Sequence, residues 1–294
     1  MKSPLAFAVV LLMLLSACTL FVSLDVVEES DAAQETGDYG YTLTGDTVTA
    51  FNQSKVVIRN SSVKYIAAYN ESGHTSPWTT VQELYIYTPI TVKNLSFQDC
   101  TSLTKLVMEF DYTDSASIQY GAFKRCTSLT EVSIKGFSCI QSQVFMNCSS
   151  LTKAAIEQTP EIWKETFSGC SKLETLDLKS TGSMAIAGNF FNNTGKSTEE
   201  GVAITIGCQV NFLNKTNQPL ADCFYKYKSD GTKGSISLFG NSSKIKSITW
   251  NLNQNVPNYF FKECTTLKNV TITSTSTGSD YHIGASAFHS SGVE

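Results

Sequence analysis

The sequence predicts an α/β-type solenoid, in which short coils stack side by side under a parallel β-sheet and follow a β-rich cap. Three observations support this prediction. A motif of the form Phe-x-x-Cys-x-x-Leu-x-x-apolar-x-apolar recurs along the chain, an apolar residue stands five positions before each Phe, and apolar and polar residues alternate where each motif ends. A recurrence of 22 to 27 residues is typical of proteins built from stacked repeats.

The chain begins with a segment typical of protein export. Met1 and Lys2 are followed by a nearly uninterrupted apolar run over residues 5–24 and an acidic stretch over residues 25–31, which is the order found in secretion signals. We predict that residues 1–33 are a signal peptide or an N-terminal anchor. The remainder of the chain is then extracellular or displayed at the cell surface.

Three fates of this segment fit the sequence. Ser30–Ala32 resembles a small-x-small cleavage site. Leu15–Cys18 resembles a lipobox, in which Cys18 would carry a lipid, although the apolar Thr19–Val22 is not the usual polar tether. The third fate is an uncleaved anchor, because about 20 apolar residues are enough to span a bilayer.

Residues 34–91 are predicted to form the β-rich N-terminal cap. Strand-like pieces at residues 41–43, 55–58 and 83–87 alternate with segments rich in turn-forming residues, as in short β-hairpins and connected strands. A cap is expected here because the terminal unit of a solenoid exposes an apolar end that must be covered.

The repeat itself is clearest in five copies over residues 92–294. The segment Glu131–Lys135 alternates apolar and polar residues, which indicates a strand with one buried face. The three-residue spacing of Phe, Cys and Leu suits a short helical or 3-10 turn with one side inward. One such unit cannot bury its own apolar face, but stacked units can. The copies begin at Phe97, Phe123, Phe145, Phe167 and Phe261, with the cysteines at Cys100, Cys126, Cys148, Cys170 and Cys264.

Two parts of this repeat region are irregular. The interval from Phe191 to Phe261 has room for about three degenerate units, with strands expected at residues 202–206 and 245–252 and the third not placed, so residues 192–255 form an irregular part. Near the end, Phe288 begins a new repeat, but the sequence ends at Glu294, before the strand of that repeat. Because a solenoid should not finish on an open half-unit, we expect this chain to be the N-terminal piece of a longer protein.

This repeat resembles the BspA-like leucine-rich-repeat family of surface proteins. The resemblance covers residues 92–294 and is strongest over residues 97–178. It implies a right-handed superhelix and a surface protein that binds or adheres to extracellular protein or glycan partners. It supplies no active-site residue. The alternatives are a passive envelope or spacer protein, or the non-catalytic part of a larger exported enzyme.

The candidate binding face lies at the centre of each exposed strand. Small side chains there form a smooth surface that suits an extended polypeptide or glycan, although small residues are also the default filling of a solvated strand. Charges on either side of this position alternate in sign between successive repeats, which favours correct register. The candidate residues are Val107, Ser133, Ala155, Asp177 and Thr271.

Asparagine usage supports an extracytoplasmic location. The sequon Asn-x-Ser/Thr occurs nine times, more often than chance predicts, and marks possible N-glycosylation. A polar β-rich surface with many Asn, Ser and Thr residues explains the same excess without modification. The sequons are at Asn52, Asn60, Asn70, Asn94, Asn147, Asn192, Asn214, Asn241 and Asn269.

Composition and motifs argue against several other functions. The formal net charge is −4 and there is no basic cluster, so nucleic acid is not an expected partner. The sequence has no CxxC pair and no P-loop, Gly-x-Ser-x-Gly or His-Glu-x-x-His motif, so we expect no metal, cofactor or catalytic site. Membrane contact is expected only through an N-terminal or a missing C-terminal anchor. We expect the repeat cysteines to be free, and Cys208 with Cys223 is the best candidate for a disulfide.

Overall fold

A computed structural model of the chain describes residues 40–71, 78–187, 190–213, 225–227, 233–235, 243–252, 256, 261, 264–274, 282–285 and 287–293. The chain divides into two compact units, residues 1–38 and 39–294, and every described residue belongs to the second. The predicted export segment, with Cys18 and the cleavage site at residues 30–32, lies outside the described residues. Over the described ranges, no helix is long and apolar enough to cross a membrane.

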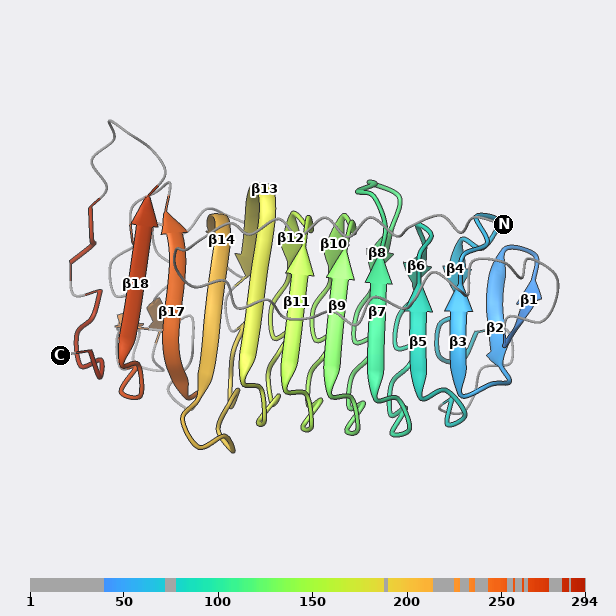
Figure 1. Cartoon of the computed structure of the whole chain (residues 1–294), viewed down its shortest axis with the longest axis horizontal. Helices are drawn as coiled ribbons and strands as arrows, with labels where there is room; N and C mark the ends of the chain where they lie inside the picture. The colour runs from blue at the N-terminus through green and yellow to red at the C-terminus, as the bar shows by residue number, and fades with distance from the viewer. Residues whose placement is uncertain are drawn as a thin grey trace, which may run out of the picture. The chain divides into compact units, whose positions relative to one another are not determined.

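Two parallel β-ladders run through the second unit (Figure 1). The long ladder contains, in spatial order, β3 (Lys55–Ile58), β5 (Glu83–Ile86), β7 (Lys105–Glu109), β9 (Glu131–Lys135), β11 (Lys153–Glu157), β13 (Thr175–Ala187), β14 (Val202–Leu213), β17 (Ile245–Leu252) and β18 (Asn269–Ser274). The short ladder contains β2 (Thr47–Phe51), β4 (Tyr65–Ile66), β6 (Thr91–Val92), β8 (Ser117–Ile118), β10 (Cys139–Ile140) and β12 (Glu161–Ile162).

One coil of the solenoid therefore consists of one long strand and the short strand that follows it in the chain. β13 and β14 belong to both ladders, because their C-terminal halves continue the short one beyond β12. Two antiparallel pairings interrupt the parallel pattern. β1 (Tyr41–Thr44) pairs with β2, and β15 (Tyr225–Tyr227) pairs with β16 (Lys233–Ser235) in a separate small sheet.

The turns between the ladders differ from the prediction. Cys126 N donates to Phe123 O at 3.3 Å and Leu129 N donates to Cys126 O at 3.1 Å, so each Phe-x-x-Cys-x-x-Leu segment makes isolated hydrogen-bonded turns. The expected helical or 3-10 turns are not confirmed, since the described residues contain no helix. The physical reason is the residue before each cysteine, which has left-handed φ and so ends any right-handed helical run. These residues are Asp99, Arg125, Asn147 and Gly169, at φ 63°, 61°, 63° and 78°.

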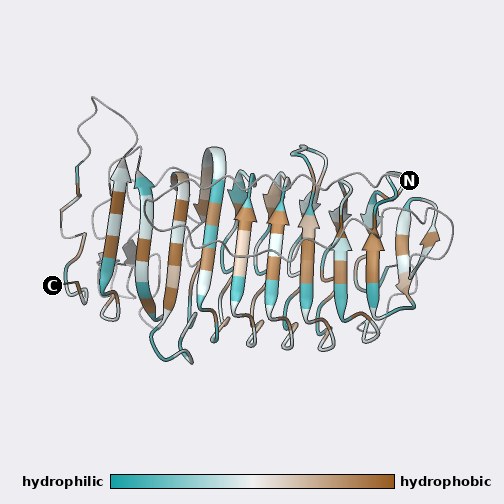
Figure 2. Ribbon diagram, in the orientation of Figure 1, coloured by the Kyte–Doolittle hydropathy of each residue, from teal (hydrophilic) through white to brown (hydrophobic). Residues whose placement is uncertain are grey.

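The repeated phenylalanines form a single column in the core, as predicted. The ring centroids of Phe123, Phe145 and Phe167 are 5.6 Å apart at each step, with interplanar angles of 15°. Phe97 extends the column at 4.9 Å and Phe191 at 6.4 Å. This spacing is close to the separation of neighbouring strands, so in-register strands bring the rings together. The matching bands of apolar strand residues recur from coil to coil (Figure 2).

A second column is made by the repeat cysteines. The thiols of Cys126, Cys148 and Cys170 donate to the backbone oxygens of Phe97, Phe123 and Phe145, each at 3.1 Å. One coil later the hydroxyl of Thr194 makes the equivalent bond to Phe167 O at 2.9 Å. Burial raises the pKa of Cys100 to about 12. The repeat cysteines are free, as predicted. Cys208, the candidate for a disulfide, is also free, and its suggested partner Cys223 lies outside the described residues.

The two irregular regions acquire a definite arrangement. Strands β1, β3 and β5 lie where the cap was expected to have strands, and β3 and β5 already continue the long ladder, which thus begins before Val92. Further along, β14 pairs directly with β17. The third unit, which the sequence did not place, is therefore not a strand of the long ladder between β14 and β17, because these two strands are hydrogen-bonded to each other.

Candidate functional site

The exposed strand centres form one continuous line, which we call the central row. Ser133, Ala155 and Asp177 are direct register partners of one another, and Val107 precedes them as the partner of Ser133. Thr271 lies two strands beyond Thr205, which pairs with Asp177. The complete row reads Val57, Tyr85, Val107, Ser133, Ala155, Asp177, Thr205, Thr249 and Thr271.

Of these nine positions, the sequence prediction gave five, with Thr249 as a candidate for a further member, and missed Val57, Tyr85 and Thr205. The repeat motif gave no signal for them, because their coils lack the cysteine that anchored the alignment of repeats. Period-two alternation within residues 83–86 and 202–206 was the signal that was available.

Exposure varies along the central row. Ser133, Ala155 and Asp177 are half-buried, whereas Thr271 is exposed. Val107 is only 6% exposed, so this predicted candidate presents little surface to a partner. Tyr85 and Val107 thus separate the half-buried Val57 from the continuous accessible part of the row, which begins at Ser133.

The charged side chains beside the central row are paired across strands, as predicted. Lys105 Nζ lies 3.4 Å from Glu131 Oε2, and Lys135 Nζ lies 3.5 Å from Glu157 Oε1. The Ser133 hydroxyl donates to Glu109 Oε1 at 2.5 Å. Because charges of opposite sign alternate at the distance of one strand, this half of the face has little net field to attract a highly charged partner.

Beyond β13 the positions directly beside the central row are uncharged. The positions that flank the central row are Ala203, Ser247 and Asn269 on one side and Gly207, Asn251 and Thr273 on the other. The face therefore changes from paired charges over β7–β13 to small uncharged residues, most of them polar, over β14–β18. Hydroxyl and amide groups both donate and accept hydrogen bonds, so this half offers contacts to a neutral ligand.

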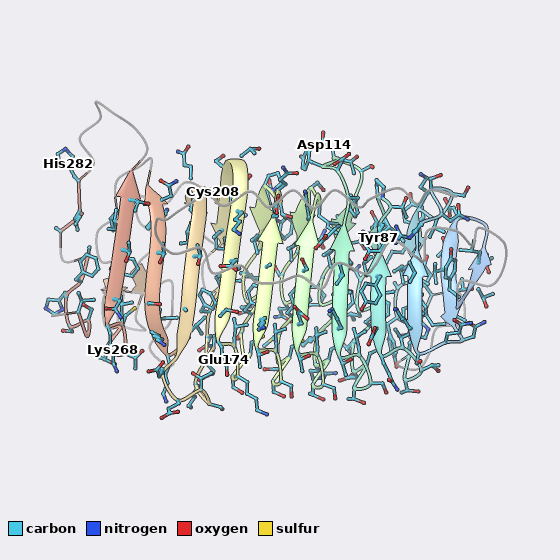
Figure 3. The ribbon with its side chains drawn as sticks, in the orientation of Figure 1. Tyr87, Asp114, Glu174, Cys208, Lys268 and His282 are labelled. Atoms are coloured by element: carbon cyan, nitrogen blue, oxygen red, sulfur yellow. The ribbon has the colours of Figure 1, made fainter. Side chains whose placement is uncertain are left out.

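The start of the long ladder carries two tyrosines that are covered by cations. Lys55 Nζ lies 5.5 Å from the ring centroid of Tyr85, and the Arg59 guanidinium lies 4.3 Å from that of Tyr87 (Figure 3). The Tyr85 hydroxyl donates to Glu83 Oε2 at 3.0 Å. Burial is the main cause that raises the pKa of both phenols. Each of the two tyrosine rings is thus engaged in a cation–π contact within the protein.

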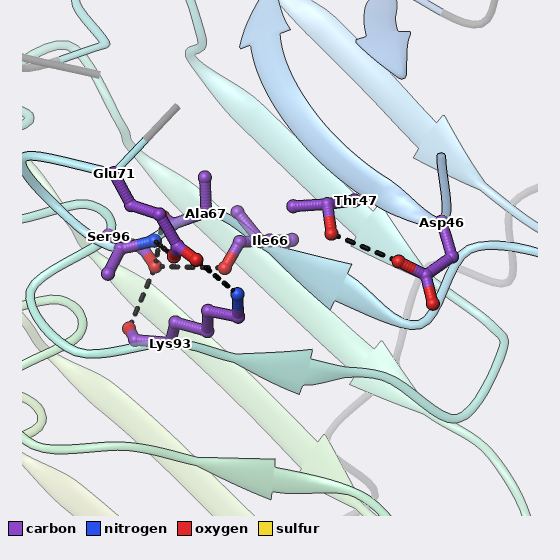
Figure 4. Close-up of polar contacts among 8 residues, drawn as sticks. Asp46, Thr47, Ile66, Ala67, Glu71, Lys93 and Ser96 are labelled. Atoms are coloured by element: carbon purple, nitrogen blue, oxygen red, sulfur yellow. Dashed lines mark hydrogen bonds and ion pairs between the residues drawn. The ribbon is translucent and has the colours of Figure 1, made fainter. Parts of the chain in front are cut away.

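Polar groups at the edge of the short ladder close turns. Ser96 is buried, and its hydroxyl lies 2.7 Å from Ala67 O and 2.8 Å from Lys93 O (Figure 4). Lys93 Nζ pairs with Glu71 Oε1 at 2.6 Å, and this hydrogen bond lowers the pKa of Glu71. These contacts tie successive coils together.

The sequons are accessible wherever the structure describes them. The asparagines lie in turns or at strand ends, and only Asn269 begins a long strand. Asn214 and Asn241 lie outside the described residues. The exposed sequon asparagines are Asn52, Asn60, Asn70, Asn94, Asn147, Asn192 and Asn269.

Within the described ranges, no group of three or more His, Cys, Asp and Glu side chains is arranged to hold a metal ion. His282 and His289 are exposed, and His289 Nδ1 lies 3.0 Å from the hydroxyl of Ser290. His74 lies outside the described residues.

Comparison with known protein families agrees with the repeat pattern. The sequence profile of the BspA type leucine rich repeat region matches residues 90–217 and 223–294, in six copies. A leucine-rich repeat protein from Bacteroides ovatus ATCC 8483 is similar at 16% identity over 87% of this chain and 78% of that chain, with a TM-score of 0.26. A leucine rich cell surface protein from Faecalibacterium prausnitzii A2-165 is similar at 14% identity over 83% of this chain and 95% of that chain, with a TM-score of 0.29. No curated protein matches. Because the profile covers more than half of the chain, the protein belongs to the BspA type leucine-rich-repeat family.

Proposed function

We propose that this protein is exported to the cell surface and binds an extracellular protein or glycan along the central row, without catalysis of its own. The observation that carries the proposal is the unbroken register from Ser133 to Thr271, which holds small polar side chains on a rigid sheet. Repeat proteins commonly bind partners along such extended surfaces. Family membership and the apolar N-terminal run of the sequence support a surface location.

The geometry also favours a partner that lies across several coils. Neighbouring strands are about 4.8 Å apart, so the strands from β9 to β18 present the row at regular intervals to an extended chain. The paired charges beside the row disfavour a highly charged partner, and the uncharged end at Thr249 and Thr271 adds hydrogen-bonding groups.

The test uses the full chain and two substitutions on the same strand. Ala155→Trp places a bulky side chain in the central row, whereas Glu157→Gln changes a flanking charge and keeps the size of the side chain. Saturable binding is measured to extracellular matrix proteins, to whole cells and to a glycan array. We expect Ala155→Trp to weaken binding at least tenfold and Glu157→Gln to leave it within twofold.

Two results would refute the proposal. One is the absence of saturable binding to any of these probes. The other is binding that is unchanged by Ala155→Trp while circular dichroism shows the variant to be folded. Either result would favour a passive spacer, for which the alternating charges serve register and solubility alone.

A further inference from the structure

The outward side of the short ladder carries a second cluster of surface residues, on β8, β10, β12 and the segments that follow them. Cys139 and Glu161 are register partners, and Ile140 and Ile162 beside them are buried. Side chains alternate between the two faces of a strand, so Cys139 and Glu161 face outward. The next outward positions are Gln141 and Trp163, both partly exposed.

Two aromatic rings belong to this cluster. Tyr120 follows β8 and is 40% exposed, and Trp163 follows β12. Tyr112 is 46% exposed and stands in the loop between β7 and β8 that is marked by Asp114 in Figure 3. Its hydroxyl donates to Asp114. This hydrogen bond is the main cause of the raised pKa of Tyr112. The cluster itself is made by Tyr120, Trp163 and the polar side chains of the same coils.

Hydrogen bonds hold the polar side chains of this cluster in place. Gln143 Oε1 accepts from the Tyr120 hydroxyl at 2.8 Å and from Lys124 Nζ at 2.9 Å, and Gln143 Nε2 donates to Glu165 Oε2 at 2.6 Å. Trp163 Nε1 donates to Glu161 Oε2 at 3.1 Å. An amide has two donors and two acceptor lone pairs, and a carboxylate has about four acceptor sites. These contacts therefore orient the amide and carboxylate groups, and some of their hydrogen-bonding sites remain available to a ligand.

We propose that this surface, which we call the short-ladder patch, binds a neutral polysaccharide chain. It comprises Tyr120, Gln141, Gln143, Glu161 and Trp163. Exposed aromatic rings pack against the C–H faces of sugar rings, while amides and carboxylates hydrogen-bond to hydroxyl groups. The side chains come from three successive coils, which span about 10 Å at the spacing of neighbouring strands, so an extended chain fits better than a single small molecule.

The charge of the patch supports a neutral ligand. Lys124 and Lys164 balance Glu161 and Glu165, so no excess of either sign attracts a polyelectrolyte. The patch lies on the other ladder from the central row. The proposal thus goes beyond the proposed function, and substitutions in the two surfaces separate them.

Binding can be followed through Trp163. The chain has three tryptophans, of which Trp250 is fully buried. The full-length protein is titrated with linear hexasaccharides of β-1,4-glucan, β-1,3-glucan, β-1,4-mannan and β-1,4-xylan, and with polygalacturonate as the charged comparison. We expect saturable binding of at least one neutral hexasaccharide with a change in tryptophan fluorescence, and weaker binding of polygalacturonate.

Substitutions then locate the site. Trp163→Ala and Tyr120→Ala are each expected to weaken binding at least tenfold by calorimetry, whereas Ala155→Trp in the central row leaves the affinity for the hexasaccharide unchanged. The proposal is overturned if no neutral hexasaccharide binds, if polygalacturonate binds more tightly, or if Trp163→Ala binds like the unmodified protein. Loss of hexasaccharide binding in Ala155→Trp alone would assign the sugar to the central row and overturn the short-ladder patch.

Cys139 gives a test that needs no aromatic substitution. It is only partly buried, whereas the other described cysteines are buried. Modification with a bulky maleimide is expected to abolish hexasaccharide binding, and Cys139→Ser treated in the same way is expected to keep it. Unchanged binding after complete modification of Cys139 would contradict the proposal even if the Trp163 variant did not fold.

Discussion

Removing one ring from the phenylalanine column tests the architecture most directly. Phe145 is fully buried and stacks on Phe123 and Phe167, with centroids 5.6 Å away on both sides. Each aromatic contact contributes roughly 0.5–1.5 kcal/mol beyond burial, so two contacts give roughly 1–3 kcal/mol. Phe145→Leu keeps most of the apolar volume and should lose about this amount. Phe145→Ala also leaves a cavity and should cost about 3–5 kcal/mol.

Urea unfolding followed by circular dichroism measures both changes as a lower midpoint. Tyr112→Ala is the matched control, because this exposed ring should change stability by only about 0.5 kcal/mol. Since each coil contacts only its neighbours, Phe145→Ala also weakens the coupling between the two halves of the solenoid, and we expect its transition to broaden. A cost below about 1 kcal/mol for Phe145→Ala, or equal costs for the Ala and Leu variants, would refute the stacked column.

Three further predictions follow from the contacts between coils. Cys148→Thr should keep the hydrogen bond to the preceding coil, as Thr194 does in its own coil, and should be more stable than Cys148→Ala in the same urea assay. Glu131→Lys places a third cation between Lys105 and Lys153 and should lower the free energy of unfolding by roughly 0.2–1 kcal/mol. The loss should be smaller in about 0.5 M salt, because salt screens the repulsion between exposed charges. The pKa of Asp99 is lowered, chiefly by its hydrogen bond to Arg125, so its stabilising effect is full above the ordinary value of 3.8 and is lost as the pH falls through the lower folded value. Asp99→Asn should therefore flatten the acid side of a stability curve measured down to about pH 2, and an unchanged curve would show that this pair does not contribute.

The repeat pattern of the sequence was sufficient to predict the core and most of the central row. Once strands stack in register, equivalent positions of successive copies become neighbours, so Phe123, Phe145 and Phe167 had to meet, and so did Ser133 and Ala155. The same argument predicted the opposite charges on adjacent strands, two of which form ion pairs. The argument from register did not predict that Val107 is buried, because burial depends on the side chains around the strand and not on its register.

Three features were decided only by the tertiary structure. The turns are not helical because residues such as Arg125 and Asn147 adopt positive φ. A glycine at these positions would have indicated positive φ in the sequence, whereas Arg and Asn do not. The direct pairing of β14 with β17 joins segments separated by an insertion, and local periodicity carries no information about such distant partners. The short-ladder patch gathers Tyr120, Gln143 and Trp163 from turns outside the motif. The sequence by itself thus determined which side chains repeat in the core, and the folded chain decided which irregular surface residues lie together, because only stacking of the coils sets the positions of the turns.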